Sequence, residues 1–204
     1  MSEVLSVNVG IAKPLHTAGD RVVLSAIVKS PVAGPVAVRW LGLEGDEQAD
    51  HSVHGGPQKA VYAYPVEHYG FWDTLRRQSL RPEGSVVQQG LIPYAEIDDL
   101  PPGAMGENLT TRGLDERTLY ICDRLDIGSV QALVVAPREP CFKFNARMGL
   151  KHAARMMVQS GFCGFYLQVM REGSIDTGDT ITVTPGERLL TVAEAFSMRM
   201  NRRA

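Results

Sequence analysis

Val135-Ala136-Pro137-Arg138-Glu139-Pro140-Cys141-Phe142-Lys143-Phe144-Asn145 is the stretch of sequence on which both the fold and the site depend. An apolar run typical of a strand, residues 132–136, leads into a turn bounded by Pro137 and Pro140. Because proline fixes φ and lacks an N–H donor, the two prolines predict a stiff, non-helical platform instead of a continuing strand. The platform presents a single cysteine, Cys141.

The charged neighbours of Cys141 favour a reactive thiol. Arg138 and Lys143 flank the cysteine, and positive neighbours stabilise the thiolate, which is the form that attacks electrophiles and binds soft metals. The alternative is a small buried hydrophobe, because free cysteine is among the most buried residue types. This stretch alone gives the two interpretations equal weight.

Length and composition indicate a globular chain that forms one good-sized domain, or a domain with a short appendage. The chain has 204 residues, of which 44% are hydrophobic and 22% are charged, and its net charge is −2. This charge gives no indication of a general nucleic-acid binder. Cys122, Cys141 and Cys163 are odd in number and have no CxxC spacing, which argues against a disulfide framework and against a zinc site built from cysteine alone.

The distribution of apolar residues predicts neither a membrane span nor a signal peptide. No apolar run approaches the length of a membrane span, and residues 1–10 lack the charged-then-apolar layout of a signal peptide. We therefore expect no membrane partner and a cytoplasmic location.

Short segments with period-2 alternation, separated by frequent glycine and proline, predict a chain rich in strands. The expected strands are residues 4–11, 22–27, 36–40, 60–64, 119–122, 130–136, 165–170 and 180–183. Many short strands with few helices favour a closed or strongly curved β domain that is followed by a helical appendage.

Three helices and one long loop are expected between these strands. The helices are residues 65–77, beginning at a proline, residues 150–159, ending before Gly161, and a last helix from about residue 192 to 203. Thr191-Val192-Ala193-Glu194 has the capping-box pattern that begins this last helix. Residues 79–91 are expected to form a loop.

Residues 46–56 place three acids and two histidines in one polar loop. Imidazole and carboxylate suit zinc or iron, but the spacing matches no known zinc cage. His54-Gly55-Gly56, with Lys59 close by, instead offers N–H groups without Cβ obstruction beside a cation, which is a combination that holds an anion. A polar turn whose histidines cap backbone groups has equal weight.

Residues 103–110 form a second polar segment with glycines for close approach. Its Asn108 amide can donate and accept at once, so it can bind the edge of a heterocycle, although the signal alone is weak. The chain has no GxSxG nucleophile elbow, no Walker phosphate loop and no dinucleotide GxGxxG. These absences argue against the catalytic and nucleotide-binding classes that depend on those motifs.

In this order the segments resemble the MOSC domain, the module named after the C-terminal region of molybdenum cofactor sulfurase, and within it the YiiM type. The resemblance covers roughly residues 4–183 and rests on residues 42–50, 54–61, 64–65, 106–110 and 137–143, on Tyr69 and Trp72, and on Gly173, Gly178 and Asp179. It implies a mainly β fold with α, namely a MOSC-type β-barrel with peripheral helices and a short C-terminal helix. The barrel domain is expected at residues 1–185, with its motif core at about 25–183, and the appendage at residues 186–204.

The resemblance also implies a molybdenum–molybdopterin cofactor, with Cys141 as metal ligand and catalytic residue. A soft thiolate suits a metal that carries two dithiolene sulfurs, and arginine and lysine suit a phosphate. The cofactor-binding residues implied are His54, Gly55, Lys59, Glu107, Asn108, Leu109, Arg138, Lys143 and Asn145. Cys122 and Cys163 are expected to be packed and not catalytic.

The implied activity is molybdenum-dependent reduction of small N-hydroxylated compounds, such as hydroxylaminopurines, amidoximes and hydroxylamines. A separate electron-donor protein, a flavin or iron–sulfur reductase, would restore the metal, and a homodimer stays open. YiiM-type chains usually end in three helices, whereas one is expected here after Pro185. This difference keeps a non-catalytic molybdopterin-binding or carrier protein as an alternative. A cysteine-based sulfur carrier is the other alternative, although the stiff proline-bounded turn argues against it.

Overall fold

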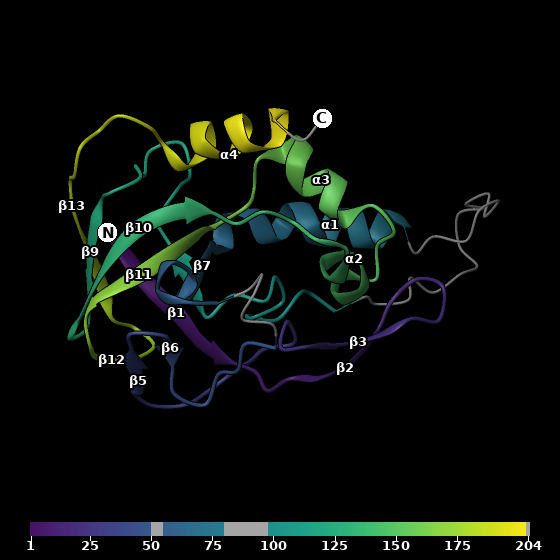
Figure 1. Ribbon diagram of the computed structural model, residues 1–204, viewed down its shortest axis with the longest axis horizontal. Helices are drawn as coiled ribbons and strands as arrows, with labels where there is room; N and C mark the ends of the chain where they lie inside the picture. The colour runs from purple at the N-terminus through teal and green to yellow at the C-terminus, as the bar shows by residue number, and fades with distance from the viewer. Residues whose placement is uncertain (50–54, 80–97, 203–204) are drawn as a thin grey trace, which may run out of the picture.

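The computed structural model describes residues 1–49, 55–79 and 98–202, and a closed seven-stranded barrel forms its centre (Figure 1). Each strand is hydrogen-bonded to the next in the order β13-β9-β10-β11-β7-β8-β1, and β1 pairs back with β13. The barrel strands are β1 Ser2–Val9, β7 Val61–Pro65, β8 Leu109–Arg112, β9 Arg124–Ile127, β10 Val130–Pro137, β11 Phe165–Arg171 and β13 Thr180–Thr184. Closure gives both edges of the sheet a partner.

Alternation along the strands produces the barrel's interior. In β10, Val130, Ala132 and Val134 are buried, while the residues between them are only half-buried. All pairings in the barrel are antiparallel except β7 with β8, which is parallel. The mainly β barrel class predicted from the sequence is confirmed.

Helices cover one side of the barrel and the end at which the site lies. They are α1 Tyr69–Ser79, α2 Phe142–Met148, α3 Ala153–Ser160 and α4 Val192–Asn201, and short 3-10 turns cover Pro57–Lys59 and Val66–His68. The capping box at α4 is present as predicted, since Glu194 N donates to Thr191 Oγ1 at 3.1 Å and Thr191 N donates to Glu194 Oε2 at 2.8 Å. None of the described helices is long and apolar enough to span a membrane.

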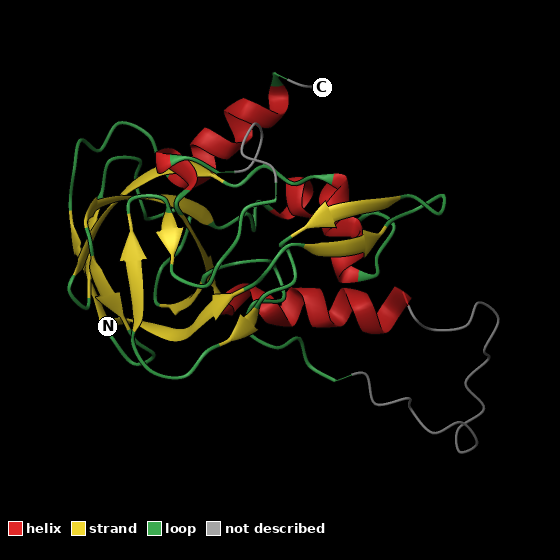
Figure 2. Ribbon diagram, turned by 60° about the horizontal axis from the view of Figure 1, so that its bottom comes forward, coloured by secondary structure: helices red, strands yellow, loops and turns green. Residues whose placement is uncertain are grey.

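Small sheets extend from the barrel. β2 Lys13–His16 and β3 Val22–Ser25 form a hairpin, β5 Val36–Arg39, β6 Gly42–Leu43 and β12 Gly173–Ile175 form a three-stranded sheet, and β4 Ser30–Pro31 pairs with the end of β1. The β2–β3 hairpin lies alongside α2, away from the barrel wall (Figure 2). This places two segments far apart in sequence, residues 13–25 and 142–148, next to one another.

Most predicted elements overlap an observed one, but the strand expected at residues 119–122 is wrong. Tyr120 makes only an isolated bridge to Thr191, and Cys122 turns with φ +73° while its N–H donates to Val134 O at 2.8 Å. The strand that pairs with β10 is β9, which begins at Arg124. Contacts with distant segments therefore override the local apolar pattern.

The sequence also missed α2 and began the following helix too early. Cys141 is extended, at φ −133° and ψ 170°, and forms the N-cap of a helix that begins at the next residue. The two prolines therefore end a strand and leave room for a helix directly after the cysteine. Gly149 ends α2, and α3 starts at Ala153, three residues after the predicted start.

The C-terminal helix contributes to the core of the barrel. Val192, Ala195 and Phe196 of α4 are buried, and α4 lies against β10. The predicted domain division near residue 185 stays a prediction. The loop expected at residues 79–91 lies outside the described residues, apart from Ser79 at the end of α1.

Candidate functional site

Cys141 lies in the wall of a pocket at the end of β10, where the strand gives way to α2. The thiol-bearing residue is partly exposed, and the same pocket is lined by segments from the β3–β4 connection and residues 46–49, by Gly55 and Gly106, and by Tyr166 of β11. These segments are distant in sequence. Only closure of the barrel brings them to one opening.

Among the described residues, four cations line this pocket together with the cysteine: Lys29, Lys59, Arg138 and Lys143. Two acids, Asp46 and Glu47, also line it. The excess of cations beside a thiol favours the thiolate and favours any anionic group placed in the pocket.

Arg138 is the most deeply buried of these four cations. Its Nη1 donates to Met105 O at 2.8 Å and to Tyr62 Oη at 3.4 Å, and its guanidinium lies 4.9 Å from the ring centres of Tyr62 and Phe144. No carboxylate of the described residues forms an ion pair with it, although only 6% of the residue is exposed. A buried charge without a counter-ion is costly, so Arg138 favours an anion in this pocket.

Lys29 is a pocket cation that sequence analysis missed. It is 8% exposed and forms a short ion pair with Asp46, whose Oδ1 also accepts from Gly10 N at 2.8 Å. Burial lowers the pKa of Lys29, and the neighbouring Asp46 opposes that shift. A lysine that follows an apolar run, as in Ala26-Ile27-Val28-Lys29, is the signal that could have identified it.

Asn108 lines the pocket, but its side-chain amide is hydrogen-bonded to other groups of the protein. Oδ1 accepts from Tyr62 N at 3.1 Å, and Nδ2 donates to Asn8 O at 3.3 Å and to Asp46 Oδ2 at 2.9 Å. The side chain thus joins β1, β7 and the 46–49 segment at the pocket wall. Its predicted contact with a cofactor stays a prediction.

Glu107 and Leu109, two other predicted residues, lie behind the pocket wall. Glu107 is fully buried, and its carboxylate accepts from Gly103 N at 2.8 Å, from Met105 N at 2.9 Å and from the hydroxyls of Thr110 and Tyr69. Burial raises the pKa of Glu107, although these hydrogen bonds oppose the shift. Glu107 therefore holds the backbone turn that presents Gly106, while Leu109 is in the core.

The other predicted residues divide between two places. Gly55, Lys59 and Lys143 line the pocket, and Lys143 Nζ donates to Leu24 O of the hairpin at 3.3 Å. Asn145 lies instead along a neighbouring groove, and its Oδ1 accepts from Ala154 N at 2.7 Å at the start of α3. His54 lies outside the described residues.

Two tyrosines that sequence analysis did not single out form an aromatic wall. Tyr62 and Tyr166 both line the pocket, with ring centres 5.4 Å apart, and Lys59 Nζ lies 6.0 Å from the Tyr166 ring centre. Burial raises the pKa of both hydroxyls, so both stay protonated at neutral pH. They offer an uncharged aromatic surface, with the two rings tilted by 44°, among the cations.

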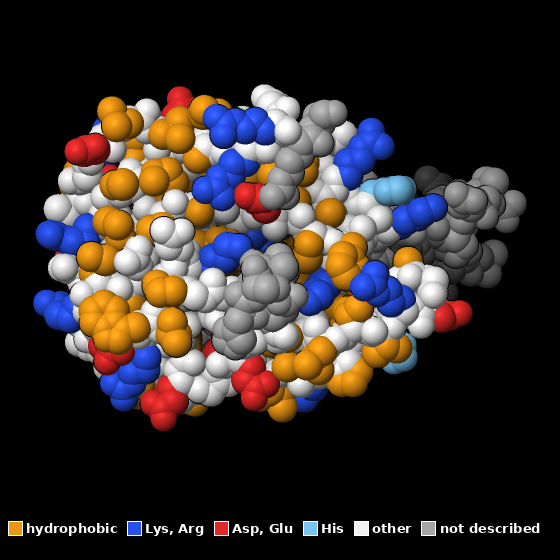
Figure 3. All heavy atoms as spheres, viewed as in Figure 1, with side chains coloured by type: hydrophobic (Ala, Val, Ile, Leu, Met, Phe, Trp, Pro, Cys, Tyr) orange, Lys and Arg blue, Asp and Glu red, His pale blue; other side chains and the backbone are white. Residues whose placement is uncertain are grey.

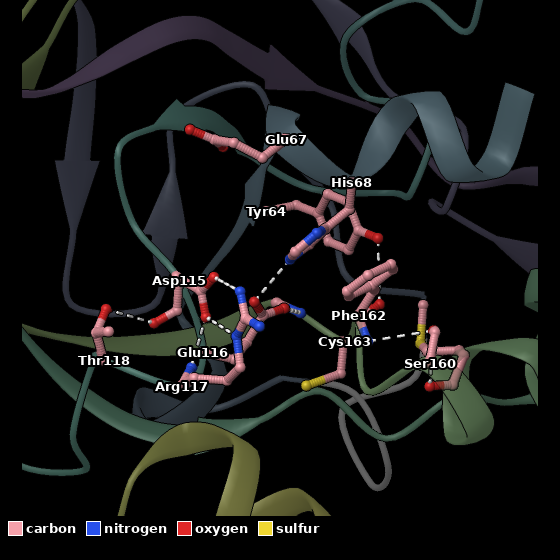
Figure 4. A network of polar contacts seen from close by, with 12 residues as sticks. Tyr64, Glu67, His68, Asp115, Glu116, Arg117, Thr118, Ser160, Phe162 and Cys163 are labelled. Carbon is pink, nitrogen blue, oxygen red and sulfur yellow. Dashed lines mark hydrogen bonds and ion pairs between the residues drawn. The ribbon is translucent and has the colours of Figure 1, made fainter.

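A network of polar contacts centred on the buried side chains of Glu116 and His68 adjoins this wall, and Figure 4 shows the network itself. Glu116 accepts from His68 Nε2 at 2.7 Å and from Gly164 N at 2.8 Å, and the His68 ring stacks on Phe162 at 3.9 Å. The 162–164 segment in turn accepts from the pocket residues, since Tyr62 Oη donates to Cys163 O at 2.9 Å and Arg138 N donates to Gly164 O at 3.4 Å.

Gly164 permits this arrangement because its φ is +64° and a Cβ there would lie 2.5 Å from Ala63 O. The network thus fixes the backbone to which Tyr62 and Arg138 are attached.

The two other cysteines differ from one another. Cys163 is fully buried, as expected, and burial raises the pKa of its thiol. Cys122 is exposed on its turn, which contradicts the expectation that it is packed.

The metal-ligating side chains at this site suit a metal that already carries ligands of its own. Within the described ranges, no group of three or more His, Cys, Asp or Glu residues could hold a bare metal ion. A metal that already carries sulfur ligands needs only one protein thiolate, which Cys141 can supply, and the surrounding cations suit an anionic organic part. The residues present therefore fit a molybdenum–molybdopterin group.

Comparisons with known proteins agree with this fold. A family model of the MOSC domain matches residues 50–182. Among curated proteins, the chain is 36% identical to the uncharacterized protein YflK of Bacillus subtilis, over 97% of this chain and 80% of that one. It is also 36% identical to the protein YiiM of Escherichia coli, over 85% of this chain and 70% of that one. A Gibberella moniliformis protein named "Reductase" is 34% identical over 88% of this chain and 28% of its own length.

Solved structures show the same relationship. The crystal structure of YiiM from Geobacillus stearothermophilus superposes with a TM-score of 0.73 at 29% identity, over 100% of this chain and 86% of that one. YiiM from Escherichia coli gives a TM-score of 0.64 at 26% identity, over 92% of this chain and 76% of that one. The chain therefore belongs to the MOSC domain family, a family associated with binding of the molybdenum cofactor.

Proposed function

We propose that this protein binds the molybdenum–molybdopterin cofactor through Cys141 and reduces small N-hydroxylated compounds. One observation carries the proposal: a partly exposed thiol shares its pocket with four cations, and one of them, Arg138, is buried with no ion-pair partner among the described residues. Such a pocket favours a soft metal on the thiolate and an anion beside it.

Separate residues would hold the separate parts of the group. Cys141 would ligate the metal, and Lys59, Arg138 and Lys143 would bind the anionic organic part, because arginine and lysine are the usual partners of phosphate. When bound, the cofactor supplies a two-electron centre that accepts oxygen. The overall conversion would be R–NHOH + 2 e⁻ + 2 H⁺ → R–NH2 + H2O.

The chain itself can supply a proton near the reaction. Lys29 lines the pocket, its pKa is lowered by burial, and its Nζ forms an ion pair with Asp46. A lysine of this kind releases a proton more readily than an exposed one. We therefore assign Lys29 the role of proton donor to the departing oxygen.

The overall conversion consumes two electrons, and we propose that a separate protein supplies them. A flavin- or iron–sulfur-carrying reductase is the donor class that we propose. Three unbridged cysteines suit a reducing compartment, so we place the protein in the cytoplasm.

Metal content is the first measurement, on chains produced in a host that makes the cofactor. We expect near-stoichiometric molybdenum in the wild type and in the matched control Cys122→Ser, which removes an exposed cysteine away from the pocket. Cys141→Ser should lose the metal. A wild-type chain without molybdenum, from a competent host, contradicts the proposal.

A turnover assay distinguishes a reductase from a protein that only carries the cofactor. The metal-loaded protein is given an amidoxime or a hydroxylaminopurine, with dithionite-reduced methyl viologen as electron source, and amidine or aminopurine is quantified. Product that disappears in Cys141→Ser supports the reductase. Bound molybdenum without product, across both substrate classes, indicates a cofactor carrier instead.

A further inference from the structure

We propose that one face of this protein docks the acidic surface of an electron-transfer protein, a proposal that rests on the proposed function. The face, which we name the docking face, is formed by the β2–β3 hairpin, α2 and α3. Its residues are Lys13, Arg21, Leu24, Phe142, Lys151 and Arg155, all of them exposed.

Two acid-poor stretches of sequence build this face. Between Glu3 and Glu44 the chain has one acidic residue, Asp20, and between Glu139 and Glu172 it has none, although the whole chain carries a net charge of −2. The first stretch contains the hairpin, and the second contains α2 and α3. The sequence therefore concentrates unbalanced positive charge in two separate segments.

The fold brings the two stretches together beside Cys141. β2 lies against α2, Lys143 Nζ donates to Leu24 O at 3.3 Å, and the Arg21 guanidinium lies 5.4 Å from the centre of the Phe142 ring. Phe142 directly follows Cys141 at the start of α2. The docking face thus borders the pocket in which the metal would be reduced.

Cations elsewhere on the surface are mostly neutralised, whereas those of the docking face are not. Ion pairs join Arg39 to Glu172, Arg76 to Asp73, Arg77 to Asp99, Arg112 to Glu3, Arg117 to Asp115, Arg124 to Asp126, Arg188 to Asp123 and Arg199 to Glu139. In the part of the chain that the structure describes, Lys13, Arg21, Lys151 and Arg155 form no ion pair. Figure 3 shows blue side chains gathered over α2, α3 and the hairpin, at the right of the view, with little red among them.

The docking face also has an apolar centre. Leu24 and Phe142 are 55% and 47% exposed, which is unusual for large apolar side chains. A groove of about 420 Å³ runs between the hairpin and α2, lined by Arg21, Phe142 and Lys151 among others, and no acidic side chain of the described residues lines it. Apolar anchors with a charged rim are the usual composition of a protein–protein interface.

The charge of the face selects the partner. A basic rim steers and orients an acidic surface, and complementary charge of this kind mainly raises the association rate. Reduction of a metal at Cys141 requires a donor whose redox group reaches this end of the barrel. We therefore assign the face to a small acidic electron-transfer protein, of flavodoxin or plant-type ferredoxin chemistry.

The test uses the metal-loaded protein, reduced flavodoxin or plant-type ferredoxin, and the double variant Arg21→Glu with Lys151→Glu. Arg171→Glu is the control: it carries the charge change of one of the two substitutions, on an exposed arginine that pairs across from Gln131, at the end of β11 remote from Pro137. Binding is measured at low and at high salt. Turnover is measured with each donor protein and, separately, with reduced methyl viologen.

We expect the double variant to weaken donor binding and donor-driven kcat/KM by about tenfold or more, and Arg171→Glu to change them by less than about twofold. Added salt should weaken wild-type binding, since it screens exposed charges. Viologen-driven turnover should stay unchanged in every variant.

Three results overturn the docking face. The first is that neither donor protein binds the wild type, and the second is that the double variant binds as tightly as Arg171→Glu. The third is that viologen-driven turnover of the double variant falls as far as its donor-driven turnover, which would indicate that the groove binds substrate instead. Failure of the proposed function looks different: the metal-loaded wild type then shows no viologen-driven turnover, and the binding measurement alone decides the docking face.

Discussion

Asn108 and Tyr62 are joined by two hydrogen bonds that run in opposite directions. Tyr62 N donates to Asn108 Oδ1 at 3.1 Å, and Asn108 N donates to Tyr62 O at 2.8 Å. These two hydrogen bonds fix the residue before β8 next to β7, and both Tyr62 and Asn108 line the pocket. An asparagine that the sequence suggests as a ligand-binding group is therefore also a structural link between strands.

Asn108→Ala should destabilise the chain by about 1–3 kcal/mol, because Tyr62 N then loses its partner in a buried place. Asp46 also loses a donor. Urea unfolding of the metal-free protein measures the change, with Asn201→Ala, on the exposed end of α4, as control. Equal midpoints for the two variants would contradict the structural role.

Gly106→Ala should destabilise the protein and distort the pocket. Its φ is +82°, and a Cβ would lie 2.7 Å from Ile27 Cγ1, so backbone strain and a clash add together. We expect a loss of at least about 1 kcal/mol in free energy of unfolding.

Gly70→Ala is the matched control for Gly106→Ala. Gly70 lies in α1, and a Cβ there meets no atom within 4 Å. This change should be neutral or stabilise the protein by up to about 1 kcal/mol, because alanine favours helix more than glycine does. A similar loss in both variants would show that the pocket position carries no special constraint.

Glu116→Ala should cost about 1–3 kcal/mol, because it leaves the buried His68 ring nitrogen and Gly164 N without their acceptor. Glu67→Ala removes an exposed carboxylate that accepts from Gly113 N at 2.7 Å, and its cost should be much smaller. Thermal and denaturant unfolding of both variants provide the comparison.

Arg138→Met should lower the reactivity of Cys141. Without the guanidinium, the thiolate fraction falls, and alkylation by iodoacetamide at neutral pH should slow by about three- to tenfold. The measurement is made on the metal-free protein in a Cys122→Ser background, so that the exposed cysteine does not react. Arg138→Lys should retain most of the rate, and equal slowing by both substitutions would assign the effect to packing instead of charge.

Asp115→Asn should change stability in a pH-dependent way. The Arg117 side chain, which pairs with it, lowers the pKa of Asp115 from 3.8 to about 2. Between these values the unfolded state binds more protons, so stability from this pair is complete above pH 3.8 and is lost as the pH falls towards 2. The difference in free energy of unfolding between wild type and Asp115→Asn should therefore shrink over that interval, whereas a constant difference would exclude the linkage.

The local sequence predicted several features because their causes are local. Alternation of apolar residues predicted the long strands, such as β10 and β11, and the Thr191-to-Glu194 pattern predicted the capping box of α4. The proline-bounded turn at Cys141 also follows from residues that are adjacent in sequence. In each case the determining contacts lie within a few residues.

Other features depend on contacts between distant segments, and local patterns do not contain them. The apolar run at residues 119–122 becomes a turn because Cys122 bonds to Val134, and the ion pair of Lys29 with Asp46 joins segments that only the folded chain brings together. The side chain of Asn145 joins α2 to the start of α3, since its amide oxygen accepts from Ala154 N, and its predicted contact with the cofactor stays a prediction.

The sequence by itself therefore determined the barrel class, the cysteine in its cationic turn and the two acid-poor stretches of chain. The tertiary structure decided which side chains share the pocket, which of them are committed to backbone groups, and that the acid-poor stretches form one face. The physical reason is that propensity and alternation act along the chain, whereas burial, ion pairing and the summed field of charges depend on distances in space.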